Sequence, residues 1–228
     1  MNRHCNWRYF GFDLFWFSDF IIIVCFGFLG GLGVLAANLW FSLGLSSGSM
    51  VAGSADTARL FFALWPAPEV QRALGDVASR AQRECGGRAV PARKIHLTLV
   101  FLGDLPRDRA AVLETLASAV KVSRFAMSVD RLEYWRHNRI LWAGMEACPE
   151  PLQTLVARMQ ESLSGAGFRC EQRPYVPHIT LLRNARRAPA DDRCRPIEWP
   201  VNDFALMESA PRERGREYQV LRSWPLSV

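Results

Sequence analysis

The sequence contains very little lysine and no closely paired cysteines. Only Lys94 and Lys121 are lysines, so nearly all of the positive charge is carried by arginine. The cysteines occur singly, without a C-x-x-C motif and without a histidine at metal-ligand spacing. They are Cys5, Cys25, Cys85, Cys148, Cys170 and Cys194. This pattern argues against a structural zinc site and against a disulfide framework, and it predicts reduced thiols in a cytoplasmic protein.

Length and charge limit the size of the core and the kind of partner only broadly. With 228 residues, half of them apolar, the chain is long enough for one sizeable core or for two small lobes that share one. The net charge of +6 suits a polyanionic partner, and the planar guanidinium group of arginine suits phosphate oxygens. Many basic proteins with no such partner have a similar charge, so charge alone does not identify the ligand.

The N-terminal region has no charged residue between Asp19 and Asp56. Its apolar run, residues 20–45, exceeds the roughly 20 residues that span a bilayer, which predicts a transmembrane helix. Met50, however, opens a segment that resembles an ordinary start followed by a first strand. We interpret residues 1–49 as an upstream extension absent from the working protein, with a membrane anchor through residues 20–45 as the alternative.

From residue 50 onward, apolar periodicity predicts alternating strands and helices. The predicted strands are 59–66, 94–104, 125–135, 139–147, 176–183, 202–210 and 216–224. The predicted helices are 67–85, 106–122 and 149–167. The mixture indicates an α+β fold for a single domain over residues 50–228.

A shift of about eighty residues superimposes two copies of a unit made of a strand, a helix and a second strand that carries a His-x-Thr-Leu motif. The segment LFFAL (60–64) falls on ILWAG (140–144), and His96 falls close to His178. Two such units predict two lobes related by a pseudo-twofold axis, with the histidine strands facing each other at the junction. Ligand pockets favour such junctions.

The repeated motif places two kinds of functional group on each strand. Because side chains alternate along a strand, His96 and Thr98 share one face, as do His178 and Thr180. A single such histidine is usually a half-buried residue bonded to a carbonyl, but two at matching places in a repeat are difficult to explain in that way. Imidazole titrates near neutral pH, so one ring can act as a general acid and the other as a general base.

The same groups suit displacement at phosphorus. Threonine hydroxyls can hold the non-bridging oxygens while the two imidazoles act on the attacking and leaving sides. Acid–base pairs supply on the order of a hundred- to ten-thousand-fold per group, which favours a strained cyclic phosphodiester over an ordinary RNA linkage. We expect no cofactor and no metal. The residues alone do not say which histidine is the acid.

Four segments carry a resemblance to a known family: RLFFALWP (59–66), HLTLVFLGD (96–104), PHITLLR (177–183) and REYQVLRSWPL (216–226). They resemble the RNA 2′,3′-cyclic phosphodiesterases of the two-histidine (2H) phosphoesterase superfamily, once named 2′-5′ RNA ligases. The resemblance covers residues 50–228. It implies a bilobal fold in which two small, mainly antiparallel sheets face a central groove with helices outside, and it implies hydrolysis of a terminal 2′,3′-cyclic phosphate to a 2′-phosphate.

The resemblance also implies roles for individual residues. His96 is expected to protonate the leaving 3′ oxygen, and His178 to accept a proton from water. Thr98 and Thr180 are expected to bind the phosphate. The implied partners are RNA ends or nucleotides that carry a 2′,3′-cyclic phosphate. We expect a monomer without an obligatory protein partner. Contact with a membrane is expected only if residues 20–45 are retained. Ligation by the same site and RNA binding without catalysis are the rival functions.

Two further residues are left open by the sequence. Tyr175 either stacks on a base or packs in the core. Arg183 lies on the opposite face from Thr180 if the strand alternates regularly past Leu182, and its contact with phosphate depends on that regularity.

Overall fold

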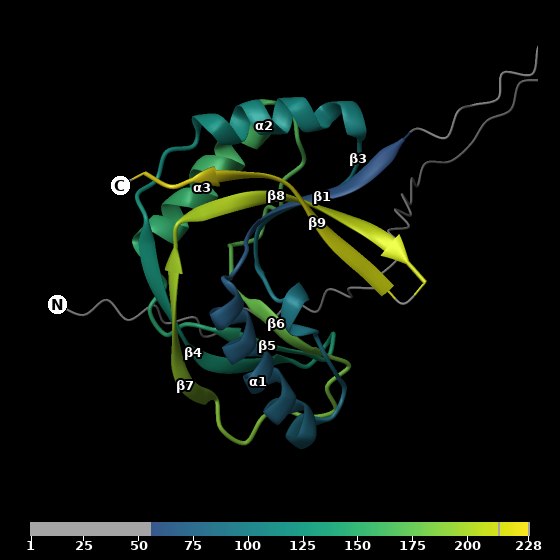
Figure 1. Cartoon of the computed structure of the whole chain (residues 1–228), viewed down its shortest axis with the longest axis vertical. Helices are drawn as coiled ribbons and strands as arrows, with labels where there is room; N and C mark the ends of the chain where they lie inside the picture. Colours follow the sequence, from purple (N-terminus) through teal and green to yellow (C-terminus); the bar gives the residue numbers. More distant parts are fainter. Residues whose placement is uncertain (1–55, 214, 228) are drawn as a thin grey trace, which may run out of the picture. The chain divides into compact units, whose positions relative to one another are not determined.

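A computed structural model describes residues 56–213 and 215–227, which belong to one compact unit (Figure 1). The predicted apolar span 20–45 and Met50 lie outside the described residues. Among the helices of residues 56–213 and 215–227, none is both long enough and apolar enough to cross a membrane.

The described chain contains nine strands and three α-helices. The strands are β1 (Thr57–Leu64), β2 (Arg88–Ala89), β3 (Leu97–Pro106), β4 (Phe125–Trp135), β5 (Ile140–Gly144), β6 (Ile179–Arg183), β7 (Arg193–Val201), β8 (Asp203–Arg212) and β9 (Gly215–Pro225). The helices are α1 (Pro68–Cys85), α2 (Ala110–Ala119) and α3 (Glu150–Gly165), with 3₁₀ turns at Ala92–Lys94 and Arg107–Arg109.

The strands form two sheets, and every pairing between named strands is antiparallel. Sheet A has the order β3-β1-β8-β9, and sheet B has the order β2-β6-β5-β4-β7. The prediction of an α+β fold with two small antiparallel sheets is therefore confirmed.

The helix of each repeat packs against the sheet of the other repeat. α1 follows β1 of sheet A but packs against β6 and β7 of sheet B, whereas α3 follows β5 of sheet B and packs against β3 and α2 (Figure 1). One contiguous cluster of buried residues consequently includes both sheets and all three helices. Separating the two lobes would expose this shared core, so the exchange of helices holds the two histidine strands in a defined relation.

The apolar stripes that predict the helices are the faces that become buried. Val70, Leu74, Val77 and Ala81 of α1 are buried. The predicted stripe of α3 is buried as well: Leu152, Leu155, Val156, Met159 and Leu163. Complete burial of a large aliphatic side chain contributes about 1.5–3 kcal/mol, so these stripes explain why the helices lie where they do.

The sequence repeat is real, but the predicted alignment of its first strands is wrong by one residue. Ala63 pairs with Thr98, whereas Trp142 pairs with Thr180, so Ala63 corresponds to Trp142 and not to Ala143. A slip of one residue moves a side chain to the other face of a strand. Apolar character alone concealed the slip, because residues on both faces of these strands are hydrophobic.

Two strands of sheet B were not predicted, the two-residue β2 and the longer β7. β7 lies at the edge of the sheet beside β4, and it contains Pro196 and Pro200. Proline lacks the N–H group that a central strand needs, but an edge strand tolerates it. The prolines therefore concealed the strand in the sequence and also explain its place at the edge.

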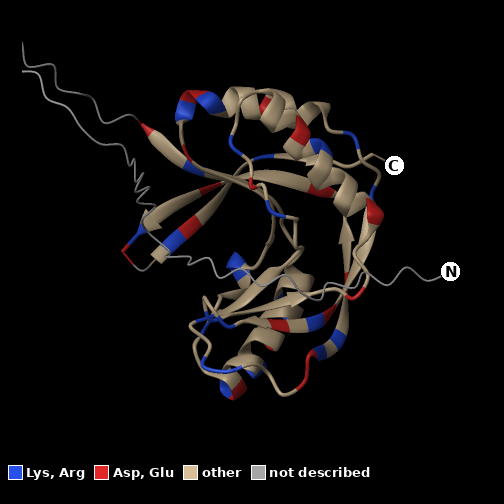
Figure 2. Cartoon of the chain, turned by 180° about the vertical axis from the view of Figure 1, so that it is seen from behind, with Lys and Arg blue, Asp and Glu red and all other residues tan. Residues whose placement is uncertain are grey.

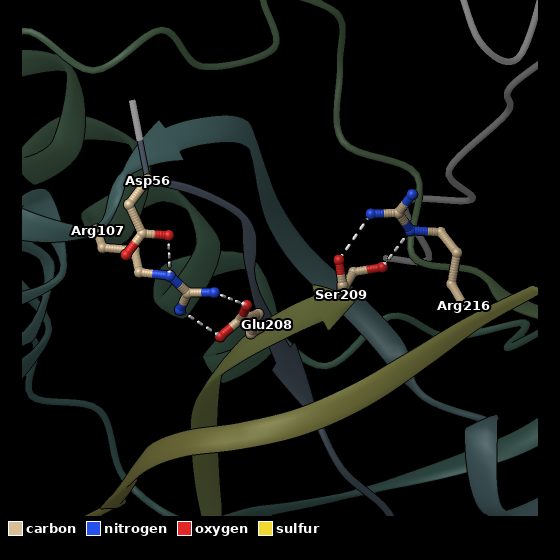
Figure 3. A network of polar contacts seen from close by, with 5 residues as sticks. All are labelled: Asp56, Arg107, Glu208, Ser209 and Arg216. Carbon is tan, nitrogen blue, oxygen red and sulfur yellow. Dashed lines mark hydrogen bonds and ion pairs between the residues drawn. The ribbon is translucent and has the colours of Figure 1, made fainter. Parts of the chain in front are cut away.

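An arginine joins the segment after β3 to β8 within sheet A. Arg107 donates two hydrogen bonds, of 2.9 and 2.7 Å, to the carboxylate of buried Glu208, and one of 2.9 Å to Asp56 (Figure 3). On β9, Arg216 donates hydrogen bonds to the hydroxyl and the carbonyl oxygen of Ser209. These contacts hold the ends of sheet A together.

Candidate active site

The two histidines lie immediately before their strands, not inside them as predicted: His96 precedes β3 and His178 precedes β6. Each ring bonds to the carbonyl oxygen of the residue two positions earlier. Nδ1 of His96 lies 2.8 Å from the Lys94 oxygen, and Nδ1 of His178 lies 2.8 Å from the Val176 oxygen. A carbonyl oxygen only accepts, so Nδ1 carries the proton in both rings and Nε2 is left for chemistry.

Aromatic rings surround His96. Trp65 stacks on the imidazole with 5.6 Å between ring centroids and an interplanar angle of 11°. Phe61 lies 5.2 Å away and Tyr218 lies 5.0 Å away, the latter edge-on. Phe61 belongs to a small apolar cluster separate from the main core, with Trp65 and Tyr218 packed against it. His96 therefore lies on the face of sheet A opposite the core.

His178 has aromatic neighbours of its own. The ring centroid of Trp135 lies 4.7 Å from that of His178, and Trp142 lies 6.1 Å away in an edge-on arrangement. Trp142 is directly opposite Thr180 in the sheet. Residues directly opposite each other in an antiparallel pair point to the same face. His178, Thr180 and Trp142 therefore share one face of sheet B.

Both histidine strands contain a β-bulge at the same place. In β3 the pairing passes from Thr98 directly to Val100, and in β6 it passes from Thr180 directly to Leu182. The extra residues are Leu99 and Leu181. All four aliphatic residues, Leu99, Val100, Leu181 and Leu182, are buried in the core.

The bulges change the face of the next residue. Regular alternation would place Arg183 opposite Thr180, but two consecutive core-facing leucines return Arg183 to the histidine face. By the same reasoning Phe101 lies on the histidine face of β3, and its side chain is 51% exposed. The aliphatic doublet after each His-x-Thr is compatible with a bulge, but it equally fits a regular strand buried on both faces, so the sequence does not determine the face of Arg183.

The two halves of the site differ at the residue that follows each aliphatic doublet. Sheet A places the exposed ring of Phe101 there, and sheet B places the guanidinium group of Arg183. At this position the pseudo-symmetric site is therefore aromatic on sheet A and cationic on sheet B. This difference gives the site a direction in which it can hold a ligand that has both a base and a phosphate.

The environment disfavours the charged form of both imidazoles in the free protein. The pKa of His96 is lowered from 6.5 to about 4, mainly because burial disfavours the charged ring. The hydrogen bond to Lys94 opposes this shift, while the charges of Arg183 and His178 add to it. Burial also lowers the pKa of His178, and Arg183 adds to that effect. Arg183 and the two histidines thus lie close enough to influence one another.

Two contacts connect the sheets and loops around the histidines. The hydroxyl of Tyr175, in the loop before His178, donates a hydrogen bond of 2.9 Å to the carbonyl oxygen of Thr98. Nζ of Lys94 donates one of 2.5 Å to the carbonyl oxygen of Arg216, which ties the turn before His96 to the hairpin that carries Tyr218. Tyr175 packs against the main core, so of its two predicted roles the contacts favour packing.

The arrangement can support acid–base chemistry from two directions. Nε2 of each histidine is available, and Thr98 and Thr180 supply hydroxyl donors on the same faces. Within residues 56–213 and 215–227, no group of three or more histidine, cysteine or acidic residues is placed to bind a metal ion. Cys85, Cys148, Cys170 and Cys194 are free thiols.

Known proteins resemble this chain in sequence and in fold. The RNA 2′,3′-cyclic phosphodiesterase of Escherichia coli (strain K12) is 30% identical over 171 residues, which cover 74% of this chain and 97% of the relative. The protein of the same name from Thermus thermophilus is 32% identical over 183 residues, covering 74% and 90%.

Solved structures agree with the sequence relatives. The crystal structure of E. coli LigT complexed with 3′-AMP matches with a TM-score of 0.70 and 29% identity, covering 76% of this chain and 100% of that chain. The structure of the apo form matches with a TM-score of 0.69 and 30% identity, covering 75% and 99%. The model of the 2′-5′ RNA ligase superfamily matches residues 66–213, and the chain belongs to this family.

Proposed function

We propose that this protein hydrolyses the terminal 2′,3′-cyclic phosphate of RNA to a 2′-phosphate by two-histidine acid–base catalysis. The observation that carries the proposal is the duplicated environment of His96 and His178, each with Nδ1 bonded to a carbonyl two residues earlier and each followed by a threonine. The relatives named RNA 2′,3′-cyclic phosphodiesterase support the same reaction.

The proposed step breaks one P–O bond and forms another. Water attacks phosphorus while Nε2 of His178 accepts a proton from it, and the bond between phosphorus and the 3′ oxygen breaks. Nε2 of His96 donates a proton to that oxygen, so the ribose keeps a 3′-hydroxyl and a 2′-phosphate. The hydroxyls of Thr98 and Thr180 donate hydrogen bonds to the non-bridging oxygens, on which negative charge increases in the transition state.

The low pKa of His96 requires an explanation if this ring is the acid. In the free protein the ring is almost entirely neutral at pH 7, because its pKa is about 4. A bound phosphodiester brings a negative charge next to the ring and therefore raises its pKa. We propose that the substrate recruits the proton that His96 then donates, which makes protonation part of substrate binding.

Two alternatives use the same residues. Ligation would join a 2′,3′-cyclic phosphate to a 5′-hydroxyl by replacing water with that hydroxyl, and the high concentration of water favours hydrolysis. A protein that only binds RNA would need hydrogen-bond donors but not two histidines with free Nε2 atoms. The orientation of both rings therefore favours a catalyst.

The test is turnover of an oligonucleotide that ends in a 2′,3′-cyclic phosphate, in the presence of EDTA. We expect hydrolysis by the protein and a decrease of at least about a hundredfold in kcat for His96→Ala and for His178→Ala, because each removes an acid–base group. Equal rates for all three proteins would overturn the two-histidine mechanism. Activity that requires added metal would show that a metal ion takes part.

A further inference from the structure

Two arginines face each other across the edge of sheet B. Arg88 of β2 lies directly opposite Arg183 of β6, and Ala89 lies opposite Leu182. Like charges at directly opposite positions destabilise an antiparallel pair. The pair therefore places two positive charges side by side at a cost in stability.

The arginine pair is on the same face as the catalytic histidines. Leu182 and its partner Ala89 pack against the core. The neighbouring pair, Arg88 and Arg183, therefore points to the opposite face, where the bulge in β6 also places Arg183. The charge of Arg183 lowers the pKa of both histidines, as expected for a cation on their face of the sheet.

Two more arginines lie next to this pair on adjacent loops. The backbone N–H of Ala185 donates a hydrogen bond of 2.9 Å to the carbonyl oxygen of Arg139, in the turn between β4 and β5. The N–H of Arg186 donates one of 2.8 Å to the carbonyl oxygen of Cys85, and its side chain lies against Gly86, just before β2. Arg139 and Arg186 are both exposed. We name Arg88, Arg139, Arg183 and Arg186 the arginine edge.

The charges of the arginine edge are not offset by carboxylates. Some arginines form ion pairs with carboxylates, as Arg59 does with Asp104 and Arg193 does with Glu146, whereas others, such as Arg169, form none within the described residues. None of the four edge arginines forms an ion pair with a carboxylate of the described part of the chain. Figure 2 shows several of the blue, basic stretches on the loops beside sheet B. The edge therefore gathers four such charges on β2, β6 and the loops next to them.

We propose that the arginine edge is a second phosphate subsite, which holds the phosphodiester on the 5′ side of the terminal nucleotide. This inference rests on the proposed function, which places the cyclic phosphate between the histidines. The cyclic phosphate carries one negative charge and already has Thr98 and Thr180 as donors. Four further guanidinium groups fit the next phosphates of an RNA strand, because arginine is well suited to phosphate oxygens and backbone contacts fix the position of a nucleic acid.

The subsite has a consequence for substrate choice. A mononucleoside 2′,3′-cyclic phosphate has no second phosphate, so it cannot use Arg88, Arg139 or Arg186. The protein therefore prefers the end of an RNA strand to a free cyclic nucleotide. Binding of the strand also depends on salt, because each phosphate contact on single-stranded nucleic acid adds about 0.7 to the slope of log affinity against log salt concentration.

The test compares two substrates: a mononucleoside 2′,3′-cyclic phosphate and a short single-stranded oligoribonucleotide with the same terminal group. For Arg88→Gln and for Arg186→Gln we expect KM for the oligonucleotide to rise about tenfold, with kcat unchanged, because each variant loses a charged hydrogen bond. Kinetics with the mononucleotide stay at the wild-type level. Arg169→Gln, at an exposed arginine after α3, is the control with the same change in net charge.

Three results would decide against the subsite: no change in KM, the same change for both substrates, or the same rise in Arg169→Gln. If the wild-type protein hydrolyses neither substrate, the proposed function fails, and fluorescence anisotropy then tests the subsite separately. In that experiment a labelled oligoribonucleotide with a 2′-phosphate end binds more weakly to Arg88→Gln, with a smaller salt slope. Unchanged anisotropy would overturn the subsite on its own.

Discussion

The hydroxyl of Tyr175 donates a hydrogen bond to the carbonyl oxygen of Thr98, and this contact is one of those that join the two halves of the site. Tyr175 lies three residues before His178, and Thr98 lies two residues after His96. The bond therefore links the segment that positions one histidine to the strand that carries the other. Burial raises the pKa of Tyr175, so the phenol remains protonated and able to donate.

Replacing Tyr175 with phenylalanine removes this link. We expect the free energy of unfolding to fall by about 1 kcal/mol, because the Thr98 carbonyl loses its partner. We also expect kcat to decrease, because the two histidine segments lose their fixed relation. Tyr134→Phe is the matched control: its hydroxyl donates to the Ala185 carbonyl within one side of the site, so stability falls similarly without loss of kcat. Equal kcat in the two variants would contradict the positioning role.

The charge of Arg183 predicts a shift in pH dependence. Its positive charge disfavours the imidazolium form of both histidines, so its removal raises the pKa of each ring. In Arg183→Gln, the pH profile of kcat/KM moves to higher pH, whereas Arg183→Lys keeps the charge and the profile. NMR titration of the histidine ring protons in the two variants measures the same shift directly. Titration curves that coincide with the wild-type curves would show that Arg183 has no electrostatic effect on the rings.

Gly144 is needed because Trp142 occupies the space beside it. A Cβ atom at position 144 would lie 2.6 Å from Cζ3 of the Trp142 ring. Gly144→Ala therefore displaces a ring that contacts His178, and overpacking of this kind costs about 1–3 kcal/mol. We expect lower stability in denaturant unfolding together with lower kcat. In Gly165→Ala, near the end of α3, the new Cβ meets no atom within 4 Å, so stability and kcat are retained.

The exposed ring of Phe101 predicts a contact with the terminal base. A base stacked on an aromatic side chain contributes about 1–3 kcal/mol, so Phe101→Ala should raise KM by roughly tenfold to a hundredfold. The value of kcat should change little, because the ring does not transfer a proton. Val112→Ala, at an exposed apolar residue of α2, serves as the control. An abasic substrate should bind equally to Phe101→Ala and to the wild type, and a difference between them would argue against stacking.

Much of the fold follows from local patterns that the sequence displays. The buried stripes of α1 and α3 follow from residues spaced at the helical period, and β1, β3 and β8 of sheet A contain the apolar runs that predict strands. β7 could not be recognised, because its prolines are acceptable only at an edge, and an edge is a property of the assembled sheet. The exchange of helices between the sheets is likewise invisible, since a stripe of leucines does not specify which sheet it covers.

The chemistry of the site is carried by the sequence: two histidines at equivalent places in a repeat, each with a threonine two residues later, already indicate an acid–base pair for phosphate esters. The repeat indicates four functional residues: His96, Thr98, His178 and Thr180. The tertiary structure alone placed Arg183 on the histidine face, set it opposite Arg88 and left Phe101 exposed at the equivalent position. The physical reason is the bulge in each strand: one unpaired residue reverses the alternation of side chains, and strand pairing, not local sequence, determines where that residue lies.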